Sequence, residues 1–405
     1  MNNNKKINNN VFPKENNDHA INYFSALADK FSKAAHILYI ALIVCFIFTL
    51  IFNSKILTYN NFNYLFKDMN AAAEIAASNY NSISYSNDNL RTTKEFRGGI
   101  ITVSTTDMAI YNATGKKTLN INYNFVQPVI ATSQKYAVIY DQGGNSYSVY
   151  NSFARVHHGK TSHPISFVTV ADNGWYALVT KDNEHTSVVH LYDDDFNLRN
   201  TYSFASKYVF SVSINAQGNR IAIVSTEAKV SGDGFITSVM ICDPGKDSSR
   251  AELILGDEIP FGATFTKGEM LNIACSDALY VLNENNGNIE NKFEFDFNNP
   301  KILSLGQAGC AIAYGDSVGA MDNTVLVFNE RGNLIYETKI NGSISDIEYI
   351  KGYVFINLNG IISKIDIKNN KVTTVDSYEK GTDIIVYDSN NILLCCQAKA
   401  KYINF

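Results

Sequence analysis

Three histidines crowd into the segment ARVHHGKTSHP, and imidazole nitrogens are common metal ligands. His157, His158 and His163 have the spacing H-H-x4-H, which matches no closed zinc ligand set. A structural zinc site needs four ligands, and no fourth ligand is evident nearby. We therefore interpret the segment as an exposed polar loop that follows a strand, with no metal site.

An acidic triplet, Asp193 to Asp195, offers the oxygen ligands that calcium prefers. The glycine and the bidentate glutamate of the EF-hand pattern are missing here. Aspartate and asparagine also favour tight turns, because their side chains bond to the nearby backbone. A turn between two strands therefore explains the triplet better than a cation site does.

Several familiar catalytic and cofactor motifs are missing from the sequence. There is no HExxH pair and no Walker loop. Asp141 to Asn145 holds two glycines but precedes no helix, so we predict a hairpin turn there. None of the six cysteines has CxxC spacing, and adjacent Cys395 and Cys396 point to opposite faces of a strand. We assign no catalytic residue, cofactor or metal, and the net charge of −5 gives no case for nucleic acid.

The most apolar part of the chain runs from Ala34 to Phe52 and contains no Lys, Arg, Asp or Glu. A helix of this length spans about 28 Å, close to the hydrocarbon thickness of a bilayer. The run is long for a cleaved signal peptide, and no small-residue cleavage pattern follows it. We predict a transmembrane helix that acts as an uncleaved signal anchor in the cell membrane.

Lysines near this span predict its orientation. Those before it are Lys5, Lys6, Lys14, Lys30 and Lys33, and those after it are Lys55 and Lys67. The excess favours a cytoplasmic N-terminus and an extracytoplasmic domain, although Lys55 weakens the bias. The predicted parts are a leader over residues 1–33, the span over 34–52, a linker over 53–81 and a domain over 82–405. We expect residues 1–18 to be disordered, and a short amphipathic helix in both the leader and the linker.

A repeat begins at about residue 82, where strand-length runs alternate with Gly, Asn and Asp. Each repeat contains a β-rich run that ends in a large side chain followed by Asp or Asn. These landmarks end at Tyr111, Tyr150, Tyr192, Cys242, Leu282, Phe328, Ile365 and Ile403, 37 to 50 residues apart. Such a period, with several strands in each unit, is typical of a β-propeller. We predict an all-β propeller with eight blades favoured and seven as the alternative.

The last repeat stops immediately after its landmark and lacks an outermost strand. Ser82 to Ser86 near the start of the domain could supply it and join the two ends of the ring. Closure of this kind removes the free sheet edges that promote aggregation.

Two repeats carry insertions, and long propeller loops often form binding surfaces. The first insertion runs from Glu227 to Gly234 and the second from Gly315 to Asn323. The candidate ligand-facing residues are Gly232, Asp233, Gly234, Asp316, Asp322 and the single tryptophan, Trp175.

The runs VIYDQGGNSYSVYNS, NGWYALVT and VVHLYDDDFN, together with the anchor, resemble an uncharacterised family. Its members are single-pass, propeller-like proteins of low-GC Gram-positive bacteria, catalogued as a domain of unknown function. More loosely, the repeats look like quinoprotein-type and WD40-type propellers. The resemblance implies an anchor and a propeller and assigns no substrate. The tryptophan docking motif that quinoprotein enzymes repeat is not found here.

These observations favour a non-enzymatic binding or scaffold protein that recruits a protein, peptide or envelope polymer outside the membrane. A hydrolase or lyase at the channel mouth is one alternative, which carboxylates and histidines with perturbed pKa values around the channel would indicate. A surface sensor that signals through its cytoplasmic leader is the other.

Overall fold

The structure is a computed structural model of the whole chain. It describes residues 14–52, 82–85, 90–112, 115–152, 154–229, 231–246, 248–295, 302–315 and 321–405. The chain separates into two compact units, Met1–Met69 and Asn70–Phe405. The described part of the first unit is one helix, and the second unit contains the described strands.

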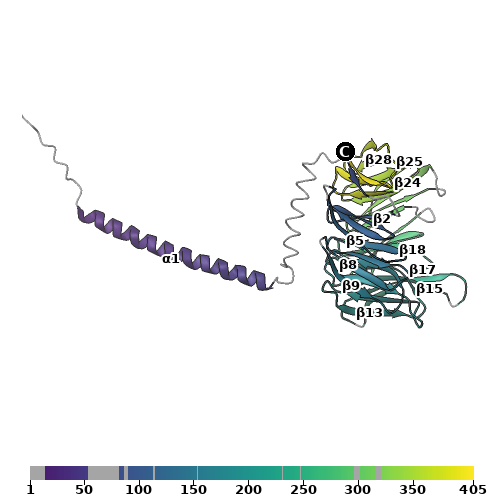
Figure 1. Cartoon of the computed structure of the whole chain (residues 1–405), viewed down its shortest axis with the longest axis horizontal. Coiled ribbons are helices and arrows are strands. Elements are labelled where there is room, and N and C mark those ends of the chain that lie inside the picture. The colour runs from purple at the N-terminus through teal and green to yellow at the C-terminus, as the bar shows by residue number, and fades with distance from the viewer. Residues whose placement is uncertain are drawn as a thin grey trace, which may run out of the picture. The chain divides into compact units, whose positions relative to one another are not determined.

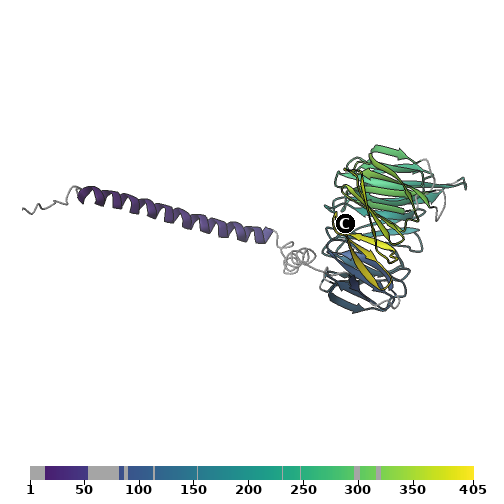
Figure 2. The same cartoon turned by 90° about the horizontal axis from the view of Figure 1, so that it is seen from above.

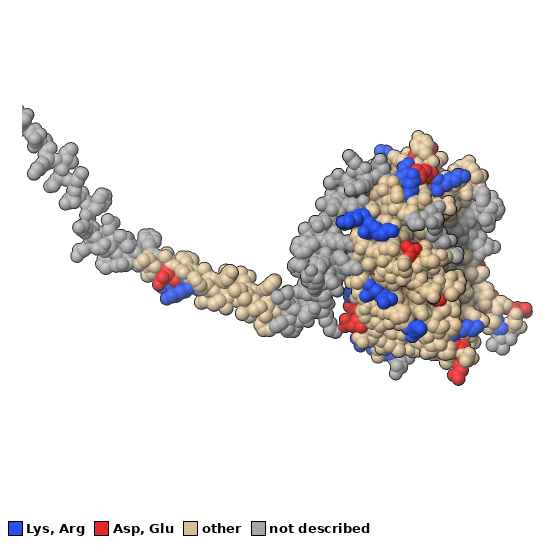
Figure 3. All heavy atoms as spheres, in the orientation of Figure 1, with Lys and Arg blue, Asp and Glu red and all other residues tan. Residues whose placement is uncertain are grey.

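Helix α1 (Lys14–Phe52) is continuous from the leader through the apolar run (Figure 1). Its stretch Ser25–Thr49 is long and apolar enough to cross a membrane. Figure 3 shows charged side chains near the start of this stretch, and the sequence has none from Ala34 to Thr49. The Thr49 hydroxyl bonds to the Cys45 carbonyl at 2.8 Å, so this polar group is satisfied within the helix.

The start of α1 differs from the predicted start of the helix. The helix begins at Lys14, so residues 14–18 are helical and our prediction that they are disordered was wrong. The apolar spacing used for that prediction starts only at Ile21, and it gave no signal for the polar first turn of the helix. The predicted linker helix lies outside the described residues.

The second unit consists of eight antiparallel sheets of four strands each, so the eight-bladed prediction is confirmed. Second strands such as β11 (Tyr176–Thr180) are buried along their whole length. Outermost strands such as β25 (Leu334–Asn341) alternate between exposed and half-buried positions. This difference follows from the architecture, because neighbouring blades cover both faces of a second strand and only one face of an outer strand is covered well.

The strands of the first four blades are, from the inside outward, as follows. Blade one has β2 (Leu90–Phe96), β3 (Gly99–Ser104), β4 (Asp107–Tyr111) and β5 (Lys117–Asn122). Blade two has β6 (Pro128–Thr132), β7 (Ala137–Asp141), β8 (Ser146–Tyr150) and β9 (Arg155–Lys160). Blade three has β10 (Ile165–Val170), β11, β12 (Ser187–Tyr192) and β13 (Leu198–Phe204). Blade four has β14 (Tyr208–Ile214), β15 (Ile221–Ala228), β16 (Phe235–Cys242) and β17 (Ser249–Gly256).

The other four blades follow the same order. Blade five has β18 (Pro260–Phe265), β19 (Met270–Cys275), β20 (Ala278–Asn283) and β21 (Ile289–Glu294). Blade six has β22 (Ile302–Gly306), β23 (Gly309–Tyr314), β24 (Asp322–Asn329) and β25. Blade seven has β26 (Asp346–Ile350), β27 (Tyr353–Leu358), β28 (Ile361–Asp366) and β29 (Lys371–Asp376). Blade eight has β30 (Asp383–Val386), β31 (Asn391–Cys395), β32 (Lys399–Asn404) and β1 (Ser82–Ser84).

The first strand of each blade contacts the first strands of both neighbouring blades, from β2 around to β30 and back to β2. These eight strands therefore surround a central channel. The turns between first and second strands lie at one end of the channel, which we call the lower face. The loops between second and third strands lie at the other end, which we call the upper face.

The ring is closed by the first strand of the domain. Strand β1 pairs with β32, with Ile83 opposite Ala400, as the sequence predicted. Ile83 is 1% exposed and lies in a core cluster with Leu393 and Ile100, which joins blades eight and one. The Tyr85 backbone amide bonds to the Ala398 carbonyl at 3.1 Å. Figure 2 shows the yellow C-terminal strands beside the blue strands of the first blade.

We predict that Ile83→Ala destabilises the propeller by about 2–4 kcal/mol, because it leaves a cavity at the point of closure. The matched control is Ile254→Ala, which removes the same atoms from a side chain that is 71% exposed and should cost under about 0.5 kcal/mol. Urea denaturation of the full chain in detergent measures both changes. Equal midpoints for the two variants would show that β1 does not contribute to closure.

Candidate functional site

The candidate residues from the sequence lie at both ends of the channel. Gly232 and Gly234 belong to the β15–β16 loop of the upper face, and both have positive φ, which favours glycine. Asp322 begins β24 and also lies toward the upper face. Trp175 precedes β11 at the lower face, where its ring packs against the Gly218 turn of the next blade. Asp316 lies outside the described residues.

The β15–β16 hairpin forms one side of an apolar groove on the upper face. Both strands have eight residues, and the hairpin extends beyond its neighbours (Figure 1). The groove has a volume of about 370 Å³. It is lined by Tyr208, Phe210, Thr226, Glu227, Ala228, Gly234, Phe235, Ile259 and Pro260. Of the five predicted candidates that the structure describes, only Gly234 is in this lining.

Exposed aromatic rings are the distinctive feature of this groove. Tyr208 and Phe210 stand at alternate positions of β14 and are 57% and 53% exposed. Ile259 from the loop before β18 adds a third exposed apolar side chain. Leaving large apolar side chains in water loses the free energy of their burial, about 1.5–3 kcal/mol for each. Clustered exposure of this kind marks interaction sites.

Asp322 lines a different cavity of about 550 Å³, formed by the ends of β23, β24 and β25. Its other described lining residues include Asn323, Thr324 and Lys339. The two predicted insertions therefore contribute to two separate hollows.

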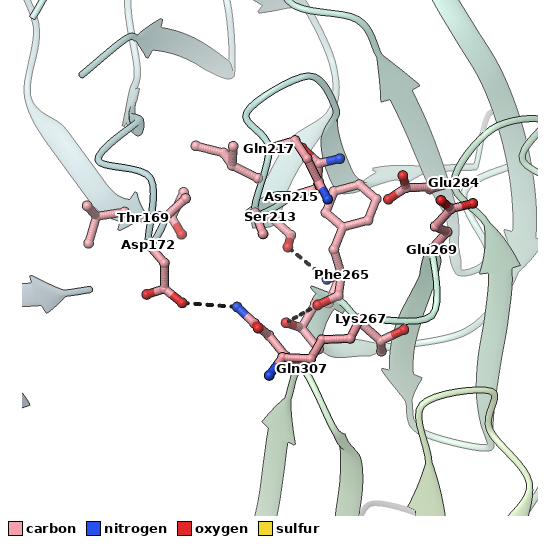
Figure 4. Close-up of a pocket in the computed structure, with 17 residues that line it drawn as sticks. Thr169, Asp172, Ser213, Asn215, Gln217, Phe265, Lys267, Glu269, Glu284 and Gln307 are labelled. Carbon is pink, nitrogen blue, oxygen red and sulfur yellow. Dashed lines mark hydrogen bonds between the residues drawn. The ribbon is translucent and has the colours of Figure 1, made fainter. Parts of the chain in front are cut away.

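A polar cavity of about 350 Å³ opens at the lower face, where β10, β14 and β18 end. Figure 4 shows its labelled side chains converging from blades three to six around a common space. Its lining combines three carboxylates, Asp172, Glu269 and Glu284, with Lys267 and several amides and hydroxyls. Only the tertiary structure reveals this cavity, because its residues are dispersed from Thr169 to Gln307 in the sequence.

Asp172 links blades at the lower face through hydrogen bonds. Its carboxylate accepts hydrogen bonds from the Gln134 backbone amide and the Gln307 side-chain amide, both at 3.0 Å. The second bond joins blades three and six, as the dashed line in Figure 4 shows. The Gln307 carbonyl also accepts the Lys267 backbone N–H at 3.0 Å. These bonds fix the rim of the lower cavity.

A second group of carboxylates lies along the channel between the innermost strands. Asp346 accepts the Ile384 N–H of β30 at 2.7 Å, and Glu348 accepts the Ser304 hydroxyl of β22 at 2.9 Å. Burial raises the pKa of Glu348 to about 7, and neighbouring Asp346 adds to this while Lys94 opposes it. Burial also raises the pKa of Asp346.

A hydrolase or lyase site would need both carboxylates and histidines with perturbed pKa values around the channel, and the described part of the channel provides only the carboxylates. Carboxylates with raised pKa values are present, but no described histidine belongs to an innermost strand, and His163 lies in the loop two residues before β10. His157 and His158 belong to the outermost strand β9, and His190 belongs to β12. Among the described residues, no group of three or more His, Cys, Asp or Glu side chains is placed to hold a metal ion.

Our interpretation of the histidine segment as a loop was wrong for its first part. His157 and His158 pair in register with Val149 and Ser148 of β8. His157 stacks on Phe196 with ring centroids 4.8 Å apart, so the ring packs between blades and is not freely exposed. Burial lowers the pKa of His157, which favours its neutral form. The turn at Asp193 is as predicted, and its carboxylate accepts the Asn197 N–H at 2.8 Å.

Four of the six cysteines are packing residues of the propeller core. Cys242, Cys275, Cys310 and Cys395 are buried, and burial raises the pKa of the Cys242 and Cys395 thiols to about 12. Cys395 ends β31 in the closing blade and contributes to the core beside β1. Cys396 follows the strand, so the prediction that both cysteines lie in one strand is correct only for Cys395.

The chain belongs to a family of unknown function, DUF5711, whose model matches residues 72–405. The predicted resemblance to a catalogued family of unknown function is thereby confirmed. No curated protein sequence matches the chain.

Several solved structures share the fold. BamB from Moraxella catarrhalis is 13% identical with a TM-score of 0.53, and the match covers 81% of this chain and 99% of that chain. The computationally designed protein Ika8 is 13% identical with a TM-score of 0.60 over 80% and 100% of the two chains. Chaetomium thermophilum Sqt1, bound to the N-terminus of ribosomal protein L10, is 10% identical with a TM-score of 0.57 over 80% and 98%. At these identities the matches show a common propeller fold and no common site.

We predict that Glu348→Gln stabilises the propeller above pH 7. The pKa of Glu348 is raised from 4.5 in the unfolded chain to about 7 in the folded protein. Between these two pH values the folded state binds a proton that the unfolded state has lost, so the stability of the parent protein falls as the pH rises from 4.5 to about 7. Glutamine keeps an acceptor for Ser304 and carries no charge. The expected gain is about 2–3 kcal/mol near pH 8 and close to zero near pH 4. Denaturation midpoints at the two pH values measure it.

The matched control for this prediction is Glu337→Gln on the exposed face of β25. It should shift the midpoint little at either pH. A Glu348→Gln variant that is less stable than the parent near pH 8 would contradict a buried carboxylate at this position.

Proposed function

We propose that this chain is a membrane-anchored binding protein whose propeller lies outside the cytoplasm and holds an extended apolar segment of a partner protein. The observation that carries the proposal is the upper-face groove, with its exposed Tyr208 and Phe210. The apolar stretch of α1 would tether the propeller to the membrane.

The lining of the groove favours a protein segment over a polysaccharide. A polymer rich in hydroxyl groups needs many hydrogen-bonding partners, whereas Tyr208, Phe210, Ile259, Phe235 and Pro260 present mainly carbon. A large apolar side chain of a partner would bury these rings and recover the free energy of removing them from water. The rings would act as the desolvated centre of the interface.

The protruding hairpin supplies the polar rim that such an interface needs. Lys229 in the loop forms an ion pair with Asp257, and Ser206 donates to the Glu227 carboxylate at 3.0 Å. These contacts hold the hairpin beside the groove while its charged groups stay accessible. Polar groups surrounding an apolar centre are typical of protein interfaces.

The fold is compatible with this role, because propellers present loops on a rigid ring. Sqt1, which shares the fold, was solved bound to the N-terminus of a ribosomal protein. That structure shows that a propeller can bind a chain terminus. The partner proposed for this chain is inferred from the lining of its own groove and not from the shared fold.

The first test of the proposal concerns orientation. Val126 is 87% exposed on the propeller, so Val126→Cys provides an accessible thiol. A membrane-impermeant maleimide should label this variant in intact cells and label the parent chain much less, because the parent thiols of the propeller are largely buried. Labelling that requires lysis would place the propeller in the cytoplasm and overturn this part of the proposal.

The second test concerns the groove. A photo-crosslinking amino acid at position 210 of the full chain in membranes should capture a partner protein that the same probe at exposed Tyr378 does not capture. Phe210→Asp should then weaken binding of the purified partner at least about tenfold, since it places a charge at the desolvated centre.

Tyr378→Asp is the control for the second test and should leave the affinity unchanged. If Phe210→Asp and Tyr378→Asp bind the captured protein equally well, the groove is not its binding site.

A further inference from the structure

We propose that the lower-face cavity is a second binding site, which takes a small organic cation bearing a primary ammonium group. This site lies at the opposite end of the channel from the apolar groove and is independent of it. Its walls are the ends of β10, β14 and β18, and the Gln307 side chain reaches toward it from blade six (Figure 4).

The charge of the cavity is unbalanced toward the negative. Its lining has three carboxylates, Asp172, Glu269 and Glu284, and one ammonium group, Lys267. Asp172 is occupied by two strong hydrogen bonds that brace the rim. Glu269 and Glu284 therefore supply the negative charge that is available to a ligand.

Glu284 is the central residue of the proposal. It is only 8% exposed, yet it lines the cavity, so its carboxylate is largely desolvated beside an open space. Burial raises the pKa of Glu284, and the nearby Glu269 raises it further, whereas Asn215 and Arg220 lower it. The negative charge of exposed Glu269 repels that of buried Glu284, and a bound cation would relieve that repulsion.

The protein's own cationic side chains near the cavity are Arg220, which is paired with another carboxylate, and Lys267, which lies at the rim. The Arg220 guanidinium forms an ion pair with Asp243 at 3.0 Å and bonds to the Asn285 side chain at 3.2 Å. Lys267 is exposed at the rim. Arg220 does not line the cavity and Lys267 is exposed, so the cavity has room for the ammonium group of a ligand.

A backbone hydrogen bond holds Glu269 and Glu284 next to each other. The Glu284 N–H bonds to the Glu269 carbonyl at 3.1 Å, which fixes the β20 end beside the turn before β19. Glu269 adopts a φ of 58°, a conformation that costs energy for a residue other than glycine. The Asn215 side-chain carbonyl accepts hydrogen bonds from the Asn219 and Arg220 backbone N–H groups, so this polar part of the wall is also fixed.

The remaining lining defines the class of ligand further. Gln217, Thr264 and Ser213 place amide and hydroxyl groups around the same space. Glucosamine and putrescine both carry a primary ammonium group, but only glucosamine has hydroxyl groups to meet these partners. A volume of about 350 Å³ is at the small end of ligand pockets and fits molecules of this size.

The test is calorimetric titration of the full chain in detergent with glucosamine, putrescine and N-acetylglucosamine near pH 6.5, where the amines are charged. We expect saturable binding of glucosamine or putrescine, and at least about tenfold weaker binding of N-acetylglucosamine, which has no ammonium group. Tighter binding of glucosamine would identify a hydroxylated amine as the ligand, and tighter binding of putrescine would identify a polyamine.

Variants locate the binding on the cavity. Glu269→Gln and Glu284→Gln should each weaken amine binding about tenfold or more, and Glu337→Gln on β25 should not change it. Because Glu269 is exposed, its variant tests the site even if Glu284→Gln lowers stability. The proposal is overturned if neither amine binds saturably, if N-acetylglucosamine binds as tightly, or if both cavity variants bind like the parent.

Discussion

The pairing of β1 with β32 is the contact on which the rest of the propeller depends. Without it, blade eight would have three strands, and the β32 edge would expose unpaired backbone groups. The strand brings Ile83 into the core shared by blades eight and one, so the closure is apolar as well as hydrogen-bonded. It joins residues more than 300 positions apart in the sequence and so converts an open row of blades into a ring.

The ring is also held together by polar side chains on the innermost strands. Ser211 and Ser213 of β14 accept backbone amides of β18, and Ser304 of β22 accepts the Tyr349 amide of β26. Asp346 makes the same kind of bond from β26 to β30. These groups satisfy backbone amides that face the next blade, where no sheet partner exists. The channel is therefore lined by polar side chains even where their role is to hold neighbouring blades together.

The two faces of the ring have different chemistry. The upper face has an apolar groove beside a long hairpin, which suits a protein segment. The lower face has a polar cavity with paired carboxylates, which suits a small cation. A rigid ring can keep two such sites apart, because the innermost strands that contribute to both sites pair with second strands that are largely buried, such as β11 and β15.

The sequence by itself determined the features that depend on neighbouring residues. The apolar run within α1, the eight strand-and-turn repeats and the missing outer strand of the last repeat are all visible in local patterns. Local patterns succeed because side-chain alternation and turn residues are set by the backbone geometry of each strand. The placement of His157 and His158 on β9 was missed, since an outermost strand with half-buried polar residues resembles a loop in composition.

Only the tertiary structure decided which residues meet. Gly234 was found from its insertion, but its aromatic neighbours Tyr208 and Phe210 come from another strand and looked like ordinary β residues. Glu269, Glu284 and Gln307 come together because blades five and six are packed around a common axis. Blade packing depends on contacts between distant segments, and no periodic pattern along a single segment specifies such contacts.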